Sequence, residues 1–115
     1  GVNMKINLID KNIEKNDTEI EIIFVKDIGN SEHKELLETL EFKAKDESCV
    51  LLAESKKIYV GYEEENYDSI AIASATAIKK LQTTKFANAR IELNEVLENN
   101  FKALIEGVIL GEYNL

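Results

Sequence analysis

The sequence predicts an α/β protein with three layers, in which helices lie on both faces of a mixed β-sheet. Short runs rich in β-branched residues alternate with longer runs whose apolar residues recur every three or four positions. Proline is absent from the 115 residues, so no predicted helix or strand is interrupted by a missing N–H group. Because there is no repeat, linker or low-complexity tract, we expect one domain around one core.

Four strands are expected in the first half of the chain. Lys5–Ile9 and Glu19–Val25 are separated by a polar loop, and the second alternates acidic with apolar residues before becoming wholly apolar. Ser48–Ala53 and Lys57–Tyr62 are apolar on both faces, which is typical of strands covered by helices. The three residues between these last two strands are few enough to predict a hairpin.

A short helix is expected between the second and third strands. Asn30 or Ser31 can cap it, and Glu32 and Glu35 would lie near the positive end of its dipole. Its predicted buried side consists of three leucines, Leu36, Leu37 and Leu40.

The longest predicted helix runs from about Tyr67 to Thr83 and is followed by a strand, Asn88–Leu93. A strand, helix and strand in this order predict a parallel, right-handed crossover. The helix residues expected to face the core share three- and four-residue spacing, and they are Ile70, Ser74, Ala77, Ile78 and Leu81.

One final helix is predicted, capped by Asn94. Gly107 lies within it, where glycine destabilises a helix by about 1 kcal/mol relative to alanine, so we expect a close helix contact there. Gly111 is expected just past the last turn, and residues 112–115 to be extended. The apolar face of this helix is expected to comprise Leu97, Phe101, Leu104, Ile105 and Val108.

Composition excludes several functions. The formal net charge of −8 disfavours nucleic-acid binding, because phosphate backbones bind clustered lysine and arginine. A single cysteine cannot form an internal disulfide bond. No apolar run reaches the roughly 18 to 20 residues that span a bilayer, and no signal peptide is recognisable, so a cytoplasmic location is expected.

Two groups of residues are candidate sites, and each is expected to be structural. Cys49 and His33 are the only candidates for a thiol–imidazole pair, but Cys49 lies in an apolar strand and His33 in a charged turn. Residues 63–65 and Asp68 are acidic, but they lack the alternation and the glycine of a calcium loop. The sequence therefore predicts no catalytic, cofactor-binding or metal-binding residue in this chain.

Two weaker patterns concern nucleotides and bases. Val60-Gly61-Tyr62 ends a strand as phosphate-binding turns do, but it has one glycine and three glutamates follow it. The tyrosines could form a stacking platform, but no basic residues lie between them, so core or interface roles are expected; they are Tyr59, Tyr62, Tyr67 and Tyr113. Tyr113 is expected to be unusually exposed.

The spacing Gly-x-x-Leu-Gly-x-Tyr-x-apolar, over residues 107–115, resembles the junction between the two domains of the leucyl aminopeptidase (cytosol aminopeptidase) family. Phe42-Lys43-Ala44-Lys45, the predicted hairpin and the alanine-rich helix follow the same order as in that family's N-terminal domain. Leu115 stands where the family usually has Phe, and Ala44 and Tyr62 where it often has Gly. The resemblance covers residues 42–115.

This resemblance implies a macro-domain-like fold and a non-catalytic N-terminal domain, over residues 4–115, of a hexameric cytosolic enzyme. The enzyme's two divalent metals, zinc or manganese, would be held by the missing C-terminal catalytic domain, which would be this domain's partner. Gly1–Asn3 is expected to be a remnant of cloning, since Met4-Lys5 is a plausible start. Two alternatives remain open, a free-standing macro-like module that binds a nucleotide metabolite and a small acidic interaction protein.

Overall fold

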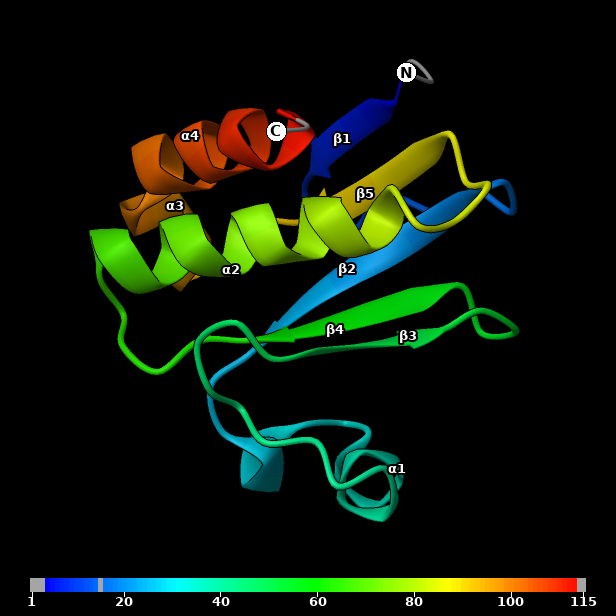
Figure 1. Cartoon of the computed structure of the whole chain (residues 1–115), viewed down its shortest axis with the longest axis vertical. Helices are drawn as coiled ribbons and strands as arrows, with labels where there is room; N and C mark the ends of the chain where they lie inside the picture. The colour runs from blue at the N-terminus through cyan, green and yellow to red at the C-terminus, as the bar shows by residue number, and fades with distance from the viewer. Residues whose placement is uncertain (1–3, 15, 114–115) are drawn as a thin grey trace.

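The computed structural model, which describes residues 4–14 and 16–113, confirms the predicted α/β class. A five-stranded mixed sheet has the order β1-β5-β2-β4-β3 (Figure 1). The first four strands in that order are parallel, and only β3 is antiparallel to its neighbour. The strands are β1 Lys5–Ile9, β2 Glu19–Val25, β3 Cys49–Leu52, β4 Lys57–Gly61 and β5 Asn88–Glu92.

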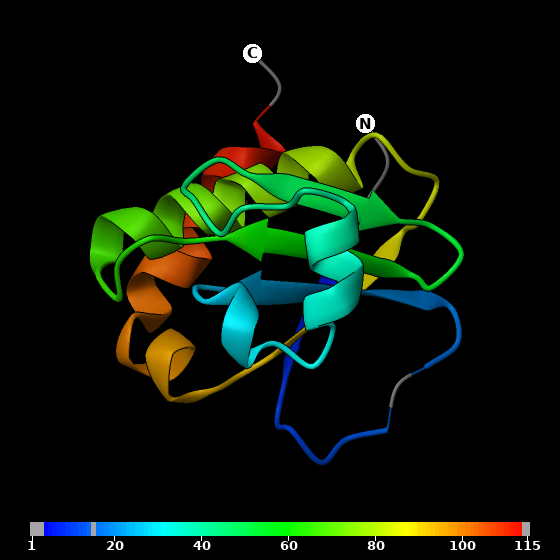
Figure 2. The ribbon, with the colours of Figure 1, turned by 90° about the horizontal axis from the view of Figure 1, so that it is seen from below.

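Two helices cover one face of the sheet and one short helix covers part of the other. Helices α2, Tyr67–Leu81, and α4, Phe101–Glu112, lie side by side, and α1, Lys34–Thr39, lies across the sheet from them (Figures 1 and 2). Ile58 and Val60 of β4 face α2, whereas Tyr59 between them packs with Leu37 of α1. The period-two alternation of a strand therefore divides the core into two clusters.

The hairpin and the parallel sense of the crossover are both confirmed. β3 pairs antiparallel with β4, and the turn between them places Lys56 at φ 55°. β4 and β5 are both parallel to β2, as the strand–helix–strand order predicts. Asn66 caps α2 by accepting a hydrogen bond from the backbone N–H of Ser69 at 3.0 Å.

The five core-facing residues predicted for α2 are all buried. The predicted bounds of β1 and β2 match the observed ones, and those of β3, β4, β5 and α2 differ by one or two residues.

The predicted single final helix is wrong, because the structure has two helices. α3, Glu95–Asn99, is capped by Asn94 as expected, and α4 begins after Asn100. Asn100 leaves the helical conformation at φ −122° and ψ 34°, and its side chain donates to the carbonyl of Val96 at 2.9 Å. Asparagine competes in this way for backbone groups. The break changes the helical phase, so Phe101 is 43% exposed instead of buried.

Gly107 and Gly111 both serve helix packing. A Cβ atom at Gly107 would lie 2.4 Å from the carbonyl oxygen of Ala71 in α2, so the predicted close contact is confirmed. The role predicted for Gly111 is wrong. It lies inside α4, no described glycine has a positive φ, and its Cβ would come within 2.8 Å of Ile78. The helix ends at Glu112, and Tyr113 is its extended C-cap.

Helix α1 differs from its prediction in two respects. His33 occupies its N-cap without a side-chain hydrogen bond, while Asn30 ends a separate 3₁₀ turn, Ile28–Asn30. Only Leu37 of the three leucines is buried, because a helix of six residues covers a narrow strip of the sheet; Leu36 and Leu40 are exposed. The expected cloning remnant, Gly1–Asn3, and the last two residues of the predicted extended end lie outside the described residues.

Candidate functional site

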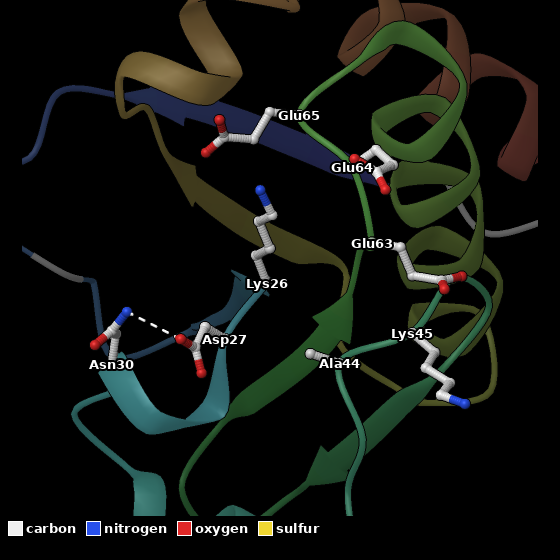
Figure 3. A pocket seen from close by; sticks show the side chains of 8 residues that line it. All are labelled: Lys26, Asp27, Asn30, Ala44, Lys45, Glu63, Glu64 and Glu65. Atoms are coloured by element: carbon white, nitrogen blue, oxygen red, sulfur yellow. Dashed lines mark hydrogen bonds between the residues drawn. The ribbon is translucent and has the colours of Figure 1, made fainter.

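The carboxyl ends of parallel strands are where open α/β sheets commonly bind ligands. Here the ends of β2 and β4 border a depression of about 680 Å³ (Figure 3). Its lining residues come from the segments after these strands and from the loop before β3, and they are Lys26, Asp27, Asn30, Ala44, Lys45, Glu63, Glu64 and Glu65. This depression is the candidate site, and we call it the carboxyl-edge site.

The charge of the carboxyl-edge site disfavours an anion. Four carboxylates and two ammonium groups line it, which leaves a formal charge of −2. Such a surface repels phosphate and pyrophosphate groups. The three consecutive glutamates point in different directions (Figure 3).

Asp46 accepts hydrogen bonds from the segment before α2 and from the first turn of α2. Its Oδ1 accepts from the backbone N–H of Glu63 at 2.9 Å, and its Oδ2 accepts from the hydroxyl of Ser69 at 3.2 Å. The backbone N–H of Glu64 is also used, because it donates to the Ser69 hydroxyl oxygen at 3.2 Å. Glu63 and Glu64 lie between β4 and α2, and Ser69 lies in the first turn of α2. The side chains of Asp46 and Ser69 therefore satisfy the N–H groups of Glu63 and Glu64 within the protein.

Gly61 is required by packing. A Cβ atom there would lie 2.4 Å from the hydroxyl oxygen of Ser48 and 2.6 Å from the carbonyl oxygen of Lys45. The next residue, Tyr62, is buried, and its ring lies 6.5 Å from that of Phe24. The Val60-Gly61-Tyr62 segment therefore holds the loop before β3 against β4 and presents no open backbone cradle.

The acidic run does not form a metal centre with its neighbours. Within residues 4–14 and 16–113, no group of three or more histidine, cysteine, aspartate or glutamate side chains is placed to hold a metal ion. Asp68 lies in the first turn of α2, where a carboxylate interacts favourably with the helix dipole. Glu63 accepts a hydrogen bond from the backbone N–H of Asp46 at 3.2 Å, so it has a structural role.

Cys49 and His33 lie on opposite faces of the sheet. Cys49 pairs in register with Val60 and packs in the α2-facing cluster, whereas the His33 ring lies 5.5 Å from the ring of Tyr59. His33 Nε2 lies 3.3 Å from the ammonium nitrogen of Lys57. Burial raises the pKa of the Cys49 thiol, which reduces the thiolate available for nucleophilic attack. The two residues do not form a catalytic pair.

The four tyrosines do not gather into one platform. Tyr59 and Tyr62 are buried, while Tyr67 is 43% and Tyr113 is 66% exposed, so the expected exposure of Tyr113 is confirmed. Burial, with smaller contributions from Glu21 and Glu32, raises the pKa of Tyr59 to about 12. No described residue forms a hydrogen bond with the Tyr59 hydroxyl.

Arg90 is a buried charged residue whose burial was not predicted from the sequence. It lies on β5 and is 1% exposed; one terminal nitrogen donates to the carbonyl of Ile13 at 2.7 Å and to Glu92 at 3.3 Å. Its Nε and other terminal nitrogen have no partner among the described residues. Arg90 therefore ties the loop after β1 to the sheet. A lone arginine between Ala89 and Ile91 was the available signal.

Comparisons with known proteins give a distant similarity to a curated protein. No family model matches the chain. A Campylobacter jejuni protein described as "Probable cytosol aminopeptidase" is 27% identical over 116 residues, which cover 96% of this chain and 23% of that relative. The chain therefore spans about a quarter of the length of the curated relative it matches. Among the described residues, no helix has the length and apolar character needed to cross a membrane. The chain is thus distantly similar to part of one cytosol aminopeptidase.

Proposed function

We propose that this chain is the non-catalytic N-terminal domain of a cytoplasmic leucyl aminopeptidase, a metal-dependent exopeptidase that removes N-terminal residues. The observation that carries the proposal is the pattern of the match. Nearly the whole chain aligns with a cytosol aminopeptidase, yet the aligned part is only 23% of that relative. A larger part of such an enzyme thus lies outside this domain.

The donor geometry supports a non-catalytic role. The family resemblance implies a pair of zinc or manganese ions, but the glutamates of the carboxyl-edge site point in different directions, and Glu63 accepts a hydrogen bond from the backbone N–H of Asp46. These residues do not fit a metal pair. We therefore assign metal binding to the catalytic domain of the longer enzyme, and to this domain roles in hexamer assembly and in access to the active site.

The residues that carry the family resemblance act in packing. Gly61 admits the loop that contains Lys45, and Gly107 and Gly111 admit the backbone of α2. A domain with a structural role needs such packing positions but needs no reactive side chain. This supports a structural contribution to a larger enzyme.

The size of the native protein tests the proposal. An antibody raised against this chain should detect, in an immunoblot of its source cells, a polypeptide several times larger than 13.0 kDa. A native product that runs near 13.0 kDa would contradict it.

A free-standing module for a nucleotide metabolite is the second candidate, because the depression lies at the carboxyl edge where such ligands bind in open α/β sheets. The macro-like topology on which it depends remains a prediction. The Asp46 contacts and the acidic lining oppose it. Calorimetry with ADP-ribose separates the two candidates: a binding module gives saturable heat, and the aminopeptidase domain gives none.

A further inference from the structure

Helix α4 carries a second apolar surface that faces away from the core. Phe101, Ile105, Ile109 and Tyr113 recur at every fourth position, so they form one row along the helix, and Leu110 lies beside them. Ile105 is half-buried, and the exposed fractions of the other four are 43% for Phe101, 51% for Ile109, 60% for Leu110 and 66% for Tyr113. We call these five residues the outer stripe.

A surface helix of a monomer normally turns charged and polar residues to solvent. The three charged residues of α4, Lys102, Glu106 and Glu112, also lie on this outer side, and Lys102 and Glu106 pair with each other at 4.0 Å. The apolar residues of the outer stripe are nevertheless large and exposed. A contiguous exposed apolar surface commonly marks an interaction site.

Rotation of α4 cannot bury the outer stripe within this domain. The inner side of α4 is already in contact with the backbone of α2, where a single added carbon at Gly107 would lie 2.4 Å from an oxygen atom. The large side chains of the outer stripe do not fit into that space. The described fold therefore supplies no surface that covers the stripe.

We propose that the outer stripe is the docking surface for the catalytic domain of the longer polypeptide, which would present an apolar face to it; this inference rests on the proposed function. About three quarters of the length of the Campylobacter relative lies outside the match, so such a protein has ample chain to cover the stripe. The most exposed members, Leu110 and Tyr113, lie at the end of α4.

A second copy of this chain fits the stripe less well. α4 has twelve residues and is therefore about 18 Å long. Two such helices alone are too short to bury the roughly 1,200 Å² that stable specific interfaces require. A domain on the same polypeptide docks over a smaller area, because the covalent connection keeps its effective concentration high.

Cysteine labelling tests the inference. Leu110→Cys is introduced, with Cys49→Ala, into both the 115-residue chain and the native full-length polypeptide, and the rate of maleimide labelling is measured in each. We expect labelling at position 110 to be about 100-fold slower in the full-length polypeptide, at every protein concentration. Leu36→Cys, on α1 across the sheet, is the matched control, and its rate corrects for any general change in reactivity; Leu36 is 40% exposed.

A corrected slowing of less than tenfold would overturn the inference, as would protection that appears in the 115-residue chain alone as its concentration rises, which would identify a second copy as the partner. The size of the native polypeptide and its hydrolysis of Leu-p-nitroanilide are measured in parallel. A large, active enzyme in which Leu110→Cys reacts rapidly refutes the docking surface alone. A native product near 13.0 kDa refutes both the docking surface and the proposed function.

Discussion

The two sides of α4 both carry apolar residues, but they differ in how closely another part of the protein can approach the helix backbone. The inner side presents Ala103, Gly107 and Gly111, which let the backbones of α4 and α2 approach closely. The outer side presents large side chains, and at Ile109 half of the surface remains exposed. Small residues thus permit close packing of α4 on α2, whereas the outer stripe is exposed in the described fold. Hydrophobicity alone does not distinguish the two.

The largest effect is expected from filling the inner side. Gly107→Val places atoms within 2.4 Å of the Ala71 carbonyl oxygen and 2.6 Å of the Ser74 Cβ, neither of which is a flexible side-chain end. We expect the free energy of unfolding to fall by about 3 kcal/mol or more, measured by urea denaturation. Ile109→Val on the outer side is the control and should change it by less than about 0.5 kcal/mol. Equal losses in the free energy of unfolding for the two variants would contradict the claim that only the inner side is tightly packed.

The hydrogen bonds of Asp46, beside the carboxyl-edge site, are expected to stabilise the fold, as the packing of the inner side of α4 does. Asp46→Ala removes the acceptor for the Glu63 N–H and the Ser69 hydroxyl, so we expect a loss of about 1 to 2 kcal/mol in the free energy of unfolding. Thermal or urea denaturation measures it. A double-mutant cycle of Ser69→Ala and Asp46→Ala is the control, because it isolates the coupling between these two side chains. Ser48 flanks the same loop but does not take part in this bond, since its hydroxyl donates to the carbonyl of Lys43. A cycle with no coupling would contradict the assigned hydrogen bond.

Tyr59 gives a smaller, pH-dependent effect. Its pKa is raised to about 12, so the fold favours the neutral phenol. That contribution is fully present below the ordinary tyrosine pKa of about 10 and is lost as the pH rises toward 12. We expect the wild-type protein to lose more stability than Tyr59→Phe between pH 10 and 12, in urea titrations.

At pH 7, Tyr59→Phe should change the free energy of unfolding by less than about 1 kcal/mol, because no described residue accepts from or donates to the hydroxyl. Parallel pH profiles for the two proteins would show that Tyr59 is not the titrating group.

The smallest effect on stability is expected on the outer stripe. Leu110→Ser changes a side chain that is 60% exposed, so the free energy of unfolding should change by less than about 0.5 kcal/mol. Binding of a hydrophobic dye to the 115-residue chain should decrease at the same time. A large destabilisation would mean that Leu110 belongs to the core.

The strands and α2 could be predicted because their signals are local. β2 follows its run of β-branched residues, and in α2 the residues at three- and four-residue spacing are buried as expected. The final helix was harder to predict, because Asn100 breaks it through a side-chain bond that many asparagines within helices do not make. Gly111 was misassigned because a capping glycine and a packing glycine look alike in sequence.

The candidate site could be predicted only in part. The acidic run after β4 and the unreactive setting of Cys49 follow from neighbouring residues in the chain. The role of Asp46 does not, since its partners lie 17 and 23 residues away. Arg90 and Ile13 are 77 residues apart, and their contact depends on the strand order. Long-range pairing, not composition, decides which polar groups are satisfied.

We propose that this domain is part of an aminopeptidase but contributes no catalytic residue. Hydrolysis of Leu-p-nitroanilide in the presence of manganese, measured in parallel for the native full-length polypeptide and for residues 4–115, tests it most directly. We expect turnover by the full-length polypeptide and none by residues 4–115. Turnover by residues 4–115 alone, or none by the full-length polypeptide, would contradict it.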